Sequence, residues 1–362
     1  MSRPLPHILL ISAALATVSA SPAAADTAVM LVDENASLFA VNLDAPTDDA
    51  LIAVNRVGVR KTALVPRSGV PDVWFSDHAS LTVNPFGLEL PSGGFNDAGL
   101  AVQAVWLDGP KAPATTANGV LETLQWIQYC LDGFTTVDEV AQSARASRIL
   151  GKAPVQILAC QPDGRCGMFE AADGKPVIRV VEELPVPLLT GVPYREGLEA
   201  LNRTLGYGGA PVEPVGAAAG PRFARGARSV HGTRTGTLAA SIPSAFRILD
   251  DLSAAGGTRW RWVADLRART LSVRTQGRAE PWTLALSDQS TACPTPQVVV
   301  DLAGERAFQV RPFVTPGDTR LTAAAAAVQP ATRDIQAGDW APAAAYPGQV
   351  GCETTGDSAS KP

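Results

Sequence analysis

The chain has 362 residues, of which 46% are apolar and 18% are charged, and its formal net charge is −5. This length and apolar content allow a large buried core, and the acidic balance argues against a nucleic-acid partner, which calls for a basic face. Only three histidines are present, and HExxH and CxxC spacings are absent. We therefore predict that the protein uses no metal and no cofactor.

The first 25 residues have the pattern of a secretory signal peptide. Arg3 precedes an apolar run from Ile8 to Val18, which is shorter than the roughly 20 residues of a membrane-spanning helix. Small residues ending at Ala25 suit a signal peptidase, so we expect Asp26 to begin a mature, periplasmic or secreted protein that has no membrane contact. An uncleaved anchor is the alternative, and the lack of a following stop-transfer pattern disfavours it.

From residue 26 onward, strand patterns dominate the first part of the chain. Strands are predicted at Ala28–Val32, Ser37–Leu43, Leu51–Val59, Ser80–Asn84 and Leu100–Leu107. Two helices follow. Apolar residues from Val120 to Leu131 recur at helical spacing, and Thr136 with Glu139 forms a capping box at the start of the second helix.

The second half of the chain mixes both patterns. Strands are predicted at Val155–Ala159, Gly167–Glu170, Val177–Val181, Trp260–Ala264, Leu271–Arg274, Trp282–Leu286 and Val298–Leu302. Helices are expected at Tyr194–Leu205 and Pro243–Leu252, with a long loop at Gly206–Pro221 between them. Such blocks of strands and helices favour an α+β layered sandwich over residues 26–320, followed by an Ala/Pro-rich extension at residues 321–362.

Five cysteines suit an oxidising compartment. Cys160 and Cys166 flank a tight turn, so a disulfide across a hairpin is predicted there. Cys293 and Cys352 are candidates for a second, longer disulfide. Cys130 lies on a helical face and is expected to be a buried free thiol.

Four segments then match one family in order. They are DTAVMLVDENASLFAVNLD from residue 26, SLTVNPFGLELPSGGFNDAGLAVQAVWLDG from residue 80, LQWIQYCLDGFTTVDEV from residue 124, and Glu183–Tyr194 with Arg222-Phe223-Ala224-Arg225 beyond it. Together they resemble the choloylglycine hydrolase and penicillin V acylase family, the linear amide C–N hydrolases of the Ntn-hydrolase superfamily. The resemblance implies a four-layer αββα sandwich, with two antiparallel or mixed sheets between helix layers, and hydrolysis of N-acyl amides.

The family's chemistry depends on the first residue of the mature chain. An N-terminal cysteine attacks the amide carbonyl, and its own α-amine, whose ordinary pKa is about 8, carries the proton. In this sequence the nucleophile position falls on Asp26, with Thr27 after it. The resemblance makes Asp44 the acid that orients the amine and Arg222 the family's late arginine.

Other positions depart from the family's pattern. The basic residue before the acid falls on Val41, and an oxyanion asparagine falls on Gly191. Asn96 matches a position in the glycine turn and Trp106 the family's Trp-Leu ending. Both are therefore candidate substrate-side residues; the simpler interpretations are a turn former for Asn96 and a core aromatic for Trp106.

The sequence therefore predicts a catalytically impaired or inactive pseudoenzyme that still binds an N-acyl amide. A carboxylate of pKa about 3.9 is ionised and attacks an amide poorly. Two alternatives remain open: an active amidase that uses Thr27 after removal of Asp26, and a periplasmic ligand-binding protein. The expected partner is a small-molecule N-acyl amide, and association of the chain into a homo-oligomer is left open.

Overall fold

The two strands of the first hairpin are rich in apolar residues and lie inside a sheet. The computed structural model describes residues 26–44, 50–64, 72–85, 87–107, 117–146, 155–172, 175–204, 219–253, 258–295, 297–302, 310–312 and 346–352. The predicted signal peptide, the 320/321 domain boundary and most of the predicted extension lie outside these residues.

A six-stranded sheet holds that hairpin. Its order is β12 (Leu188–Thr190), β1 (Thr27–Val32), β2 (Ser37–Leu43), β13 (Trp260–Asp265), β14 (Thr270–Thr275) and β15 (Arg278–Ala285). All its neighbouring strands are antiparallel. Strands β1 and β2 are neighbours in the sequence and pair with each other. Their other partners, β12 and β13, come from the second half of the chain.

A nine-stranded sheet lies against it. Its order is β11 (Lys175–Val180), β10 (Cys166–Ala172), β9 (Val155–Cys160), β8 (Ala101–Trp106), β7 (Gly93–Asn96), β6 (Ser80–Asn84), β3 (Leu51–Asn55), β16 (Val298–Asp301) and β17 (Val310–Pro312). Here too the neighbouring strands pair antiparallel. Apart from Val32 at the end of β1, strands β1 to β3 and β6 to β9 are buried along their whole length, as expected for strands covered on both faces.

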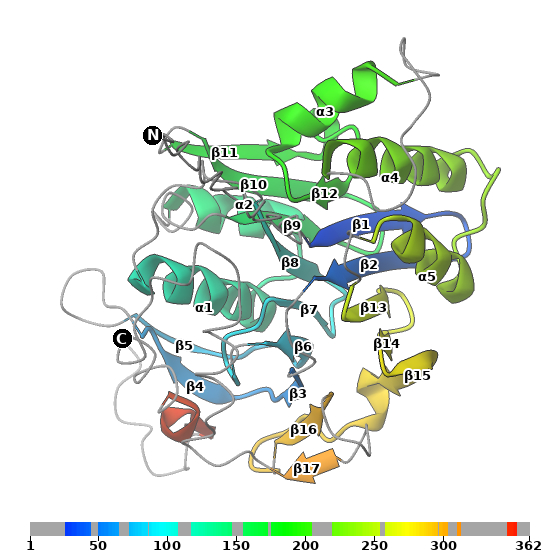
Figure 1. The fold of residues 1–362 in the computed structure, drawn as a ribbon. Coiled ribbons are helices and arrows are strands. Elements are labelled where there is room, and N and C mark those ends of the chain that lie inside the picture. The colour runs from blue at the N-terminus through cyan, green and yellow to red at the C-terminus, as the bar shows by residue number, and fades with distance from the viewer. Residues whose placement is uncertain are drawn as a thin grey trace, which may run out of the picture.

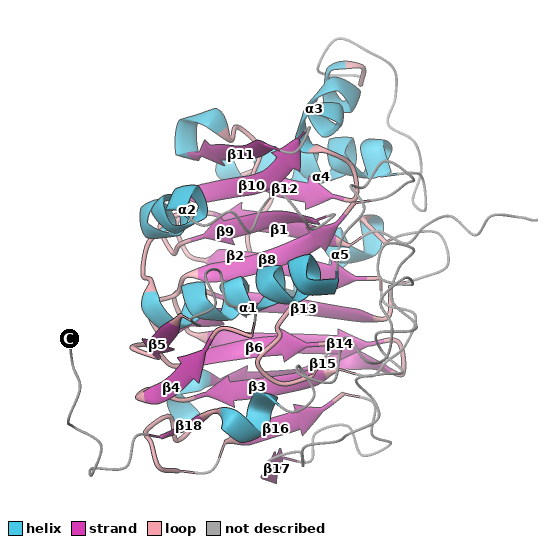
Figure 2. Ribbon diagram, turned by 90° about the vertical axis from the view of Figure 1, so that its left-hand side faces the viewer, coloured by secondary structure: helices cyan, strands magenta, loops and turns pink. Residues whose placement is uncertain are grey.

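Helices cover the outer faces of both sheets (Figures 1 and 2). The helices α1 (Ala117–Gly133) and α2 (Val137–Ala146) pack on the nine-stranded sheet. The helices α3 (Tyr194–Asn202), α4 (Ala219–Arg234) and α5 (Ile242–Asp251) form the other layer, in which α4 and α5 pack on the six-stranded sheet. This arrangement confirms the αββα sandwich.

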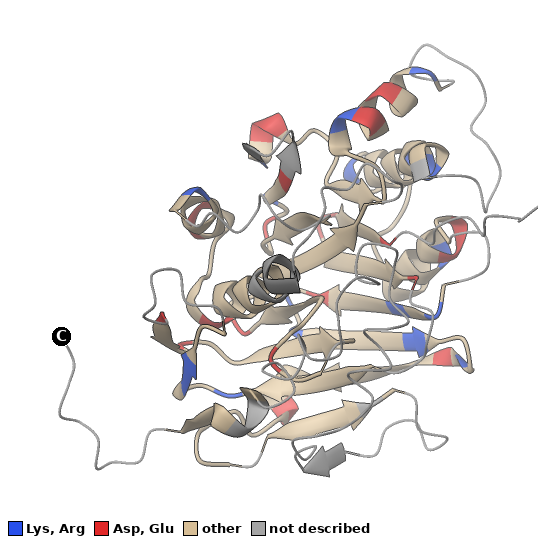
Figure 3. Ribbon diagram, turned by 60° about the vertical axis from the view of Figure 1, so that its left-hand side comes forward, with Lys and Arg blue, Asp and Glu red and all other residues tan. Residues whose placement is uncertain are grey.

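Two apolar clusters hold the layers together. One joins the two sheets and continues beneath α4 and α5, and the other lies between the nine-stranded sheet and helices α1 and α2. Charged residues gather on helices, turns and strand ends, and few lie within the sheets (Figure 3). Among the described residues, no helix has the length and apolarity needed to cross a lipid bilayer.

Several local predictions are confirmed. The capping box forms, with the Thr136 amide donating to Glu139 Oε2 at 2.9 Å and the Glu139 amide donating to Thr136 Oγ1 at 3.3 Å. Both expected disulfides are present, Cys160–Cys166 and Cys293–Cys352, and Cys130 is a buried free thiol.

Three predicted boundaries are wrong. The single strand expected at Leu51–Val59 is two strands, β3 and β4 (Val59–Thr62), because the chain turns at Gly58, whose φ is +79°. The helix expected to reach residue 205 ends at Asn202. Helix α4 begins at Ala219, inside the loop predicted for Gly206–Pro221, and Pro221 lies in its first turn, where proline's missing N–H costs no hydrogen bond.

A small third sheet closes one corner around a buried charge cluster. It consists of β18 (Gly351–Cys352), β4 and β5 (Val73–Phe75). Lys61 on β4 lies 2.7 Å from Glu89 and 3.0 Å from Asp132, and all three side chains are buried. Trp74 Nε1 also donates to Asp132 at 2.8 Å. The corner is therefore held by a cation between two carboxylates.

Lys61→Met is expected to lower the free energy of unfolding by about 3–5 kcal/mol, because it leaves two buried carboxylates without their shared cation. Guanidinium denaturation measures this value. The adjacent Arg60 is exposed, so Arg60→Met should stay within about 0.5 kcal/mol of the parent. A Lys61→Met loss as small as that of the control would contradict the structural role of the cluster.

Candidate functional site

Residue 26 lies where three strands meet. Thr27 on β1 pairs with Asn42 on β2 and with Thr190 on β12. Continuing the register by one residue places Gly191 opposite Asp26. The Asp44 backbone N–H donates to Asp26 Oδ1 at 2.9 Å, and Asp26 is only 3% exposed. Sequence positions 26, 44 and 191, which the resemblance linked, therefore gather at one end of the six-stranded sheet.

Asp44 is the centre of a buried polar network. Thr258 Oγ1 donates to Asp44 Oδ1 at 2.5 Å, and Arg222 Nη1 lies 3.4 Å from Asp44 Oδ2. Burial raises the pKa of Asp44 to about 6, although the Thr258 hydrogen bond and the positive charges of Arg222 and Arg261 act in the opposite direction. The structure thus brings Asp44 and Arg222 together, and Arg222 is itself buried.

A second arginine, not singled out from the sequence, completes this network. Arg261 on β13 lies opposite Asn42. Its guanidinium donates to the Thr258 carbonyl at 3.2 Å and to Ser253 Oγ at 2.7 Å, and lies 3.0 Å from Asp250 Oδ1. Burial lowers the pKa of Arg261, with the charge of Asp250 opposing that effect. The available sequence signal was an arginine between two tryptophans in an otherwise apolar strand.

The two faces of the six-stranded sheet differ in chemistry near this site. Asn42 faces the helices, since its Nδ2 donates to the Leu249 carbonyl of α5 at 2.7 Å. Val41 and its partner Trp262 point the other way, and Trp262 packs against Phe39 with ring centroids 5.7 Å apart. Val41, Trp262 and Phe39 are fully or almost fully buried. The space toward the second sheet is therefore filled by large apolar side chains.

Trp260 extends this packing toward residue 26. It pairs with Leu43, which the register places opposite Asp26, and its exposed fraction is 1%. Strand alternation puts Trp260 and Trp262 on the same face of β13. The described surroundings of Asp26 are thus a packed interior with a polar edge.

Thr27 differs from its polar neighbours. Its residue is fully buried, and its Oγ1 makes no hydrogen bond among the described groups. It faces Asn42 across the strand pair, and Asn42 Oδ1 is likewise buried without a hydrogen bond. Because no described group forms a hydrogen bond with its hydroxyl, Thr27 remains a candidate site residue.

Two other candidate residues lie in structural positions. Asn96 Nδ2 donates to the carbonyls of Leu131 and Phe134 at 3.0 and 2.7 Å, and its Oδ1 accepts from the Leu100 amide. It therefore ties the β7–β8 turn to the end of α1. Trp106 belongs to the apolar cluster beneath α1 and α2 and not to the cluster between the sheets.

No group of three or more His, Cys, Asp or Glu that could hold a metal ion occurs in the part of the chain that the structure describes. The groups gathered at the site are the three carboxylates of Asp26, Asp44 and Asp250, the guanidinium groups of Arg222 and Arg261, and hydroxyls. Such a set can hold charges and protons in place, but it offers no thiol.

Asp44 is expected to make stability fall with rising pH. Its pKa of about 6 in the folded chain exceeds the ordinary 3.8, so the folded state holds the proton longer than the unfolded state. The resulting stability is fully present below about pH 4 and is lost as the pH rises through about 6; the difference amounts to roughly 3 kcal/mol.

Asp44→Asn removes this titration, so its stability relative to the parent should rise between about pH 4 and about pH 6. Urea unfolding across that range measures the difference. Asp288→Asn, at an exposed residue, corrects for the loss of one surface charge. A parent-to-variant difference that is constant with pH would show that Asp44 does not titrate in this way.

Comparison with known proteins places these residues in context. No protein-family profile matches the chain. A penicillin V acylase of Pectobacterium atrosepticum is 26% identical over 234 residues, which cover 53% of this chain and 62% of that protein. The match therefore spans less than two thirds of that relative.

Solved structures share the fold over a longer stretch. Penicillin V acylase from Agrobacterium tumefaciens superposes with a TM-score of 0.64 at 21% identity, covering 79% of this chain and 94% of that one. A variant of conjugated bile acid hydrolase from Clostridium perfringens gives a TM-score of 0.54 at 14% identity, covering 80% and 98%. In sequence the chain is therefore similar to a penicillin V acylase over part of its length, and it shares the fold of penicillin V acylase and conjugated bile acid hydrolase.

Proposed function

We propose that this chain is an exported homologue of penicillin V acylase that binds N-acyl amides without hydrolysing them. One observation carries the proposal: the residue immediately before β1, where the family's cysteine is expected, is an aspartate bound to the Asp44 backbone N–H. The side chain thus serves to join two strands.

Chemistry supports the loss of hydrolysis. A thiolate attack yields a thioester that water can cleave, whereas a carboxylate attack on an amide would have to form a mixed anhydride. A carboxylate is also ionised and weakly nucleophilic at neutral pH. Removal of a nucleophile costs orders of magnitude in rate even when the remaining site is intact.

The rest of the site supports the same conclusion. Asp44 is engaged by Thr258 and Arg222, so its carboxylate is already committed to partners within the protein. Val41 is fully buried against the second sheet and Gly191 has no side chain to donate to an oxyanion. Three functions of the family's site therefore lack a matching group.

Export is supported by the sequence before residue 26 and by two disulfides. Disulfides persist in oxidising compartments such as the periplasm and the extracellular space. A shortened chain that begins at Asp26 is then the form on which function should be tested.

The first experiment assays this mature form with penicillin V and with an N-acyl homoserine lactone. No phenoxyacetate or free amine should appear, while calorimetry should detect binding of the intact amide. Asp26→Asn, of similar size but uncharged, is the matched control and should also release nothing. Sustained turnover by the parent would overturn the proposal. Absence of both binding and turnover would overturn the part of the proposal that concerns binding of N-acyl amides.

Asp26→Cys tests the placement of the nucleophile. A free N-terminal thiol and amine should restore weak amidase activity, at least tenfold above the Asp26→Asn background, with the folded state verified by circular dichroism. A folded Asp26→Cys variant with background activity would mean that the packing around Trp260 leaves no room for substrate.

A second candidate is an active amidase that uses Thr27. The buried Thr27 Oγ1, which has no hydrogen bond among the described groups, favours it. This activity requires that processing remove Asp26, so that Thr27 carries the free α-amine. Mass spectrometry of the N-terminal peptide decides between the two, because a mature chain that begins at Asp26 excludes the Thr27 mechanism.

A further inference from the structure

Three buried side chains at the small third sheet form a group that the proposed function does not use. Lys61 Nζ on β4 lies 2.7 Å from Glu89 Oε2, and 3.0 and 3.3 Å from the two carboxylate oxygens of Asp132 near the end of α1. The exposed fractions of these side chains are 1%, 4% and 0%. An amine, a carboxyl group and a second carboxylate are thus held together away from water.

The amine lies against the carbon atom of one carboxyl group. Cγ of Asp132 is bonded to both oxygens that Lys61 Nζ contacts, so these two atoms lie within about 3.6 Å of each other. A near-attack conformer requires roughly 3–3.5 Å, and groups held in that way react at effective concentrations of roughly 10⁵–10⁸ M. Attack of this amine on this carboxyl group therefore needs little further movement.

Two hydrogen-bond donors are directed at the oxygens of Asp132. Trp74 Nε1 donates to Oδ2 and Gln128 Nε2 donates to Oδ1, each at 2.8 Å. Attack on Cγ turns one of these oxygens into an oxyanion, and donors that are already in place stabilise such a charge without reorganisation. The two donors therefore favour the addition step as well as fixing the orientation of the carboxyl group.

Glu89 is placed to act as the acid–base group. Its Oε2 contacts the nitrogen that has to lose protons. Burial lowers the pKa of Arg56 and the charge of Glu89 opposes that effect, so a second cation interacts with Glu89. When a proton passes from Lys61 to Asp132, Glu89 stays ionised with Arg56 as its counter-charge. A base then lies beside a neutral amine.

The ion pair is the resting form of these three groups. Burial acts to lower the pKa of Lys61, but the charges of Asp132 and Glu89 raise it overall. The neutral amine is therefore a minor species, and a reaction through it is slow. Each chain has to react only once, however, and the neutral amide that results needs no counter-charge in a buried site.

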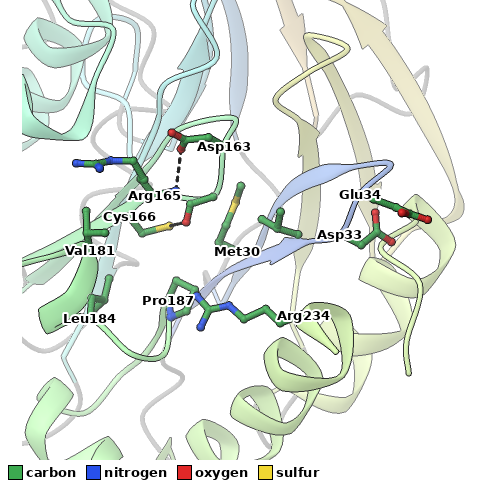
Figure 4. Close-up of a pocket in the computed structure, with 12 residues that line it drawn as sticks. Met30, Asp33, Glu34, Asp163, Arg165, Cys166, Val181, Leu184, Pro187 and Arg234 are labelled. Carbon is green, nitrogen blue, oxygen red and sulfur yellow. Dashed lines mark hydrogen bonds between the residues drawn. The ribbon is translucent and has the colours of Figure 1, made fainter. Parts of the chain in front are cut away.

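The exposed ion pair of Arg165 with Asp138 provides a contrast. Its two side chains lie 3.1 Å apart and are 43% and 68% exposed. Figure 4 shows Arg165 on its hairpin, with the side chain directed away from Met30. A guanidinium keeps its proton in proteins and is no nucleophile. Burial and an amine together distinguish the Lys61 group from this pair.

We propose that Lys61 and Asp132 condense to form an intramolecular isopeptide bond, with Glu89 moving the protons. Lys61 Nζ first passes a proton to Asp132, and its lone pair then attacks Cγ to form the C–N bond. Glu89 takes a second proton from the nitrogen and delivers it to the leaving hydroxyl, so the C–O bond breaks and water departs.

The atoms of this condensation balance without an added reactant. Of the three hydrogens of the ammonium group, one remains as the amide N–H and two leave in water, and no atom is oxidised or reduced. The product joins β4 covalently to the end of α1, 71 residues farther along the chain. This modification is independent of amide binding at Asp26.

Mass spectrometry of the mature chain, residues 26–362, tests the proposal. After incubation in the folded state, followed by reduction and unfolding, the parent should be lighter than its sequence mass by one water. Because an Asp-Gly sequence such as Asp163–Gly164 can also lose water by forming a succinimide, a tryptic digest has to locate the change. The isopeptide bond joins the tryptic peptide 61–67 to the tryptic peptide 112–145, and fragmentation of this branched species should place the link at Lys61 and Asp132.

Three variants provide the controls. Lys61→Arg keeps the positive charge and removes the amine, and Glu89→Gln keeps the size and removes the base, so both should retain the full sequence mass. Glu280→Gln, at an exposed residue of β15, should lose water as the parent does. Circular dichroism verifies that each variant is folded. A folded parent at its full sequence mass, a water loss without the branched peptide, or condensation of Glu89→Gln at the rate of the parent would each overturn the proposal.

Discussion

The pairing of β1 between β2 and β12 is the constraint on which the site depends. That register brings Asp26, which immediately precedes β1, beside the end of β2 and the end of β12, segments far apart in the sequence. Under the proposed function, the identity of residue 26 then determines the chemistry. A thiol there would carry a nucleophile, whereas the carboxylate of Asp26 accepts a backbone hydrogen bond and extends the pairing of the strands.

Burial decides how the charged groups of this protein behave. Both Asp44 with Arg222 and Lys61 with its two carboxylates lie out of solvent. Removing water raises the cost of an isolated charge, so a buried charge calls for an oppositely charged partner. The pKa of Asp44 shows the balance, because burial outweighs one hydroxyl and two arginines.

Local patterns in the sequence predicted most of the fold and only part of the site. Two apolar runs around a short polar turn located the opening hairpin, Thr136 and Glu139 located a helix start, and cysteine spacing located both disulfides, because each signal is a property of a few neighbouring residues. Helix α4 went unpredicted, since its buried positions carry mainly small side chains. Thr258 and Arg261 went unpredicted because only the pairing of β13 with β2 brings them to Asp44.

Strand β1 is buried along most of its length. At its start, Asp26 and its neighbours are buried, and Trp260 and Trp262 pack the space between the sheets. At its other end, only Val32 is partly exposed. A strand fixed by neighbours on both edges cannot shift its register without moving every residue to the opposite face. A change of function in this fold is then more readily achieved by substitution at fixed positions than by movement of the strands, and the proposed replacement of a thiol by a carboxylate at residue 26 would be a change of that kind.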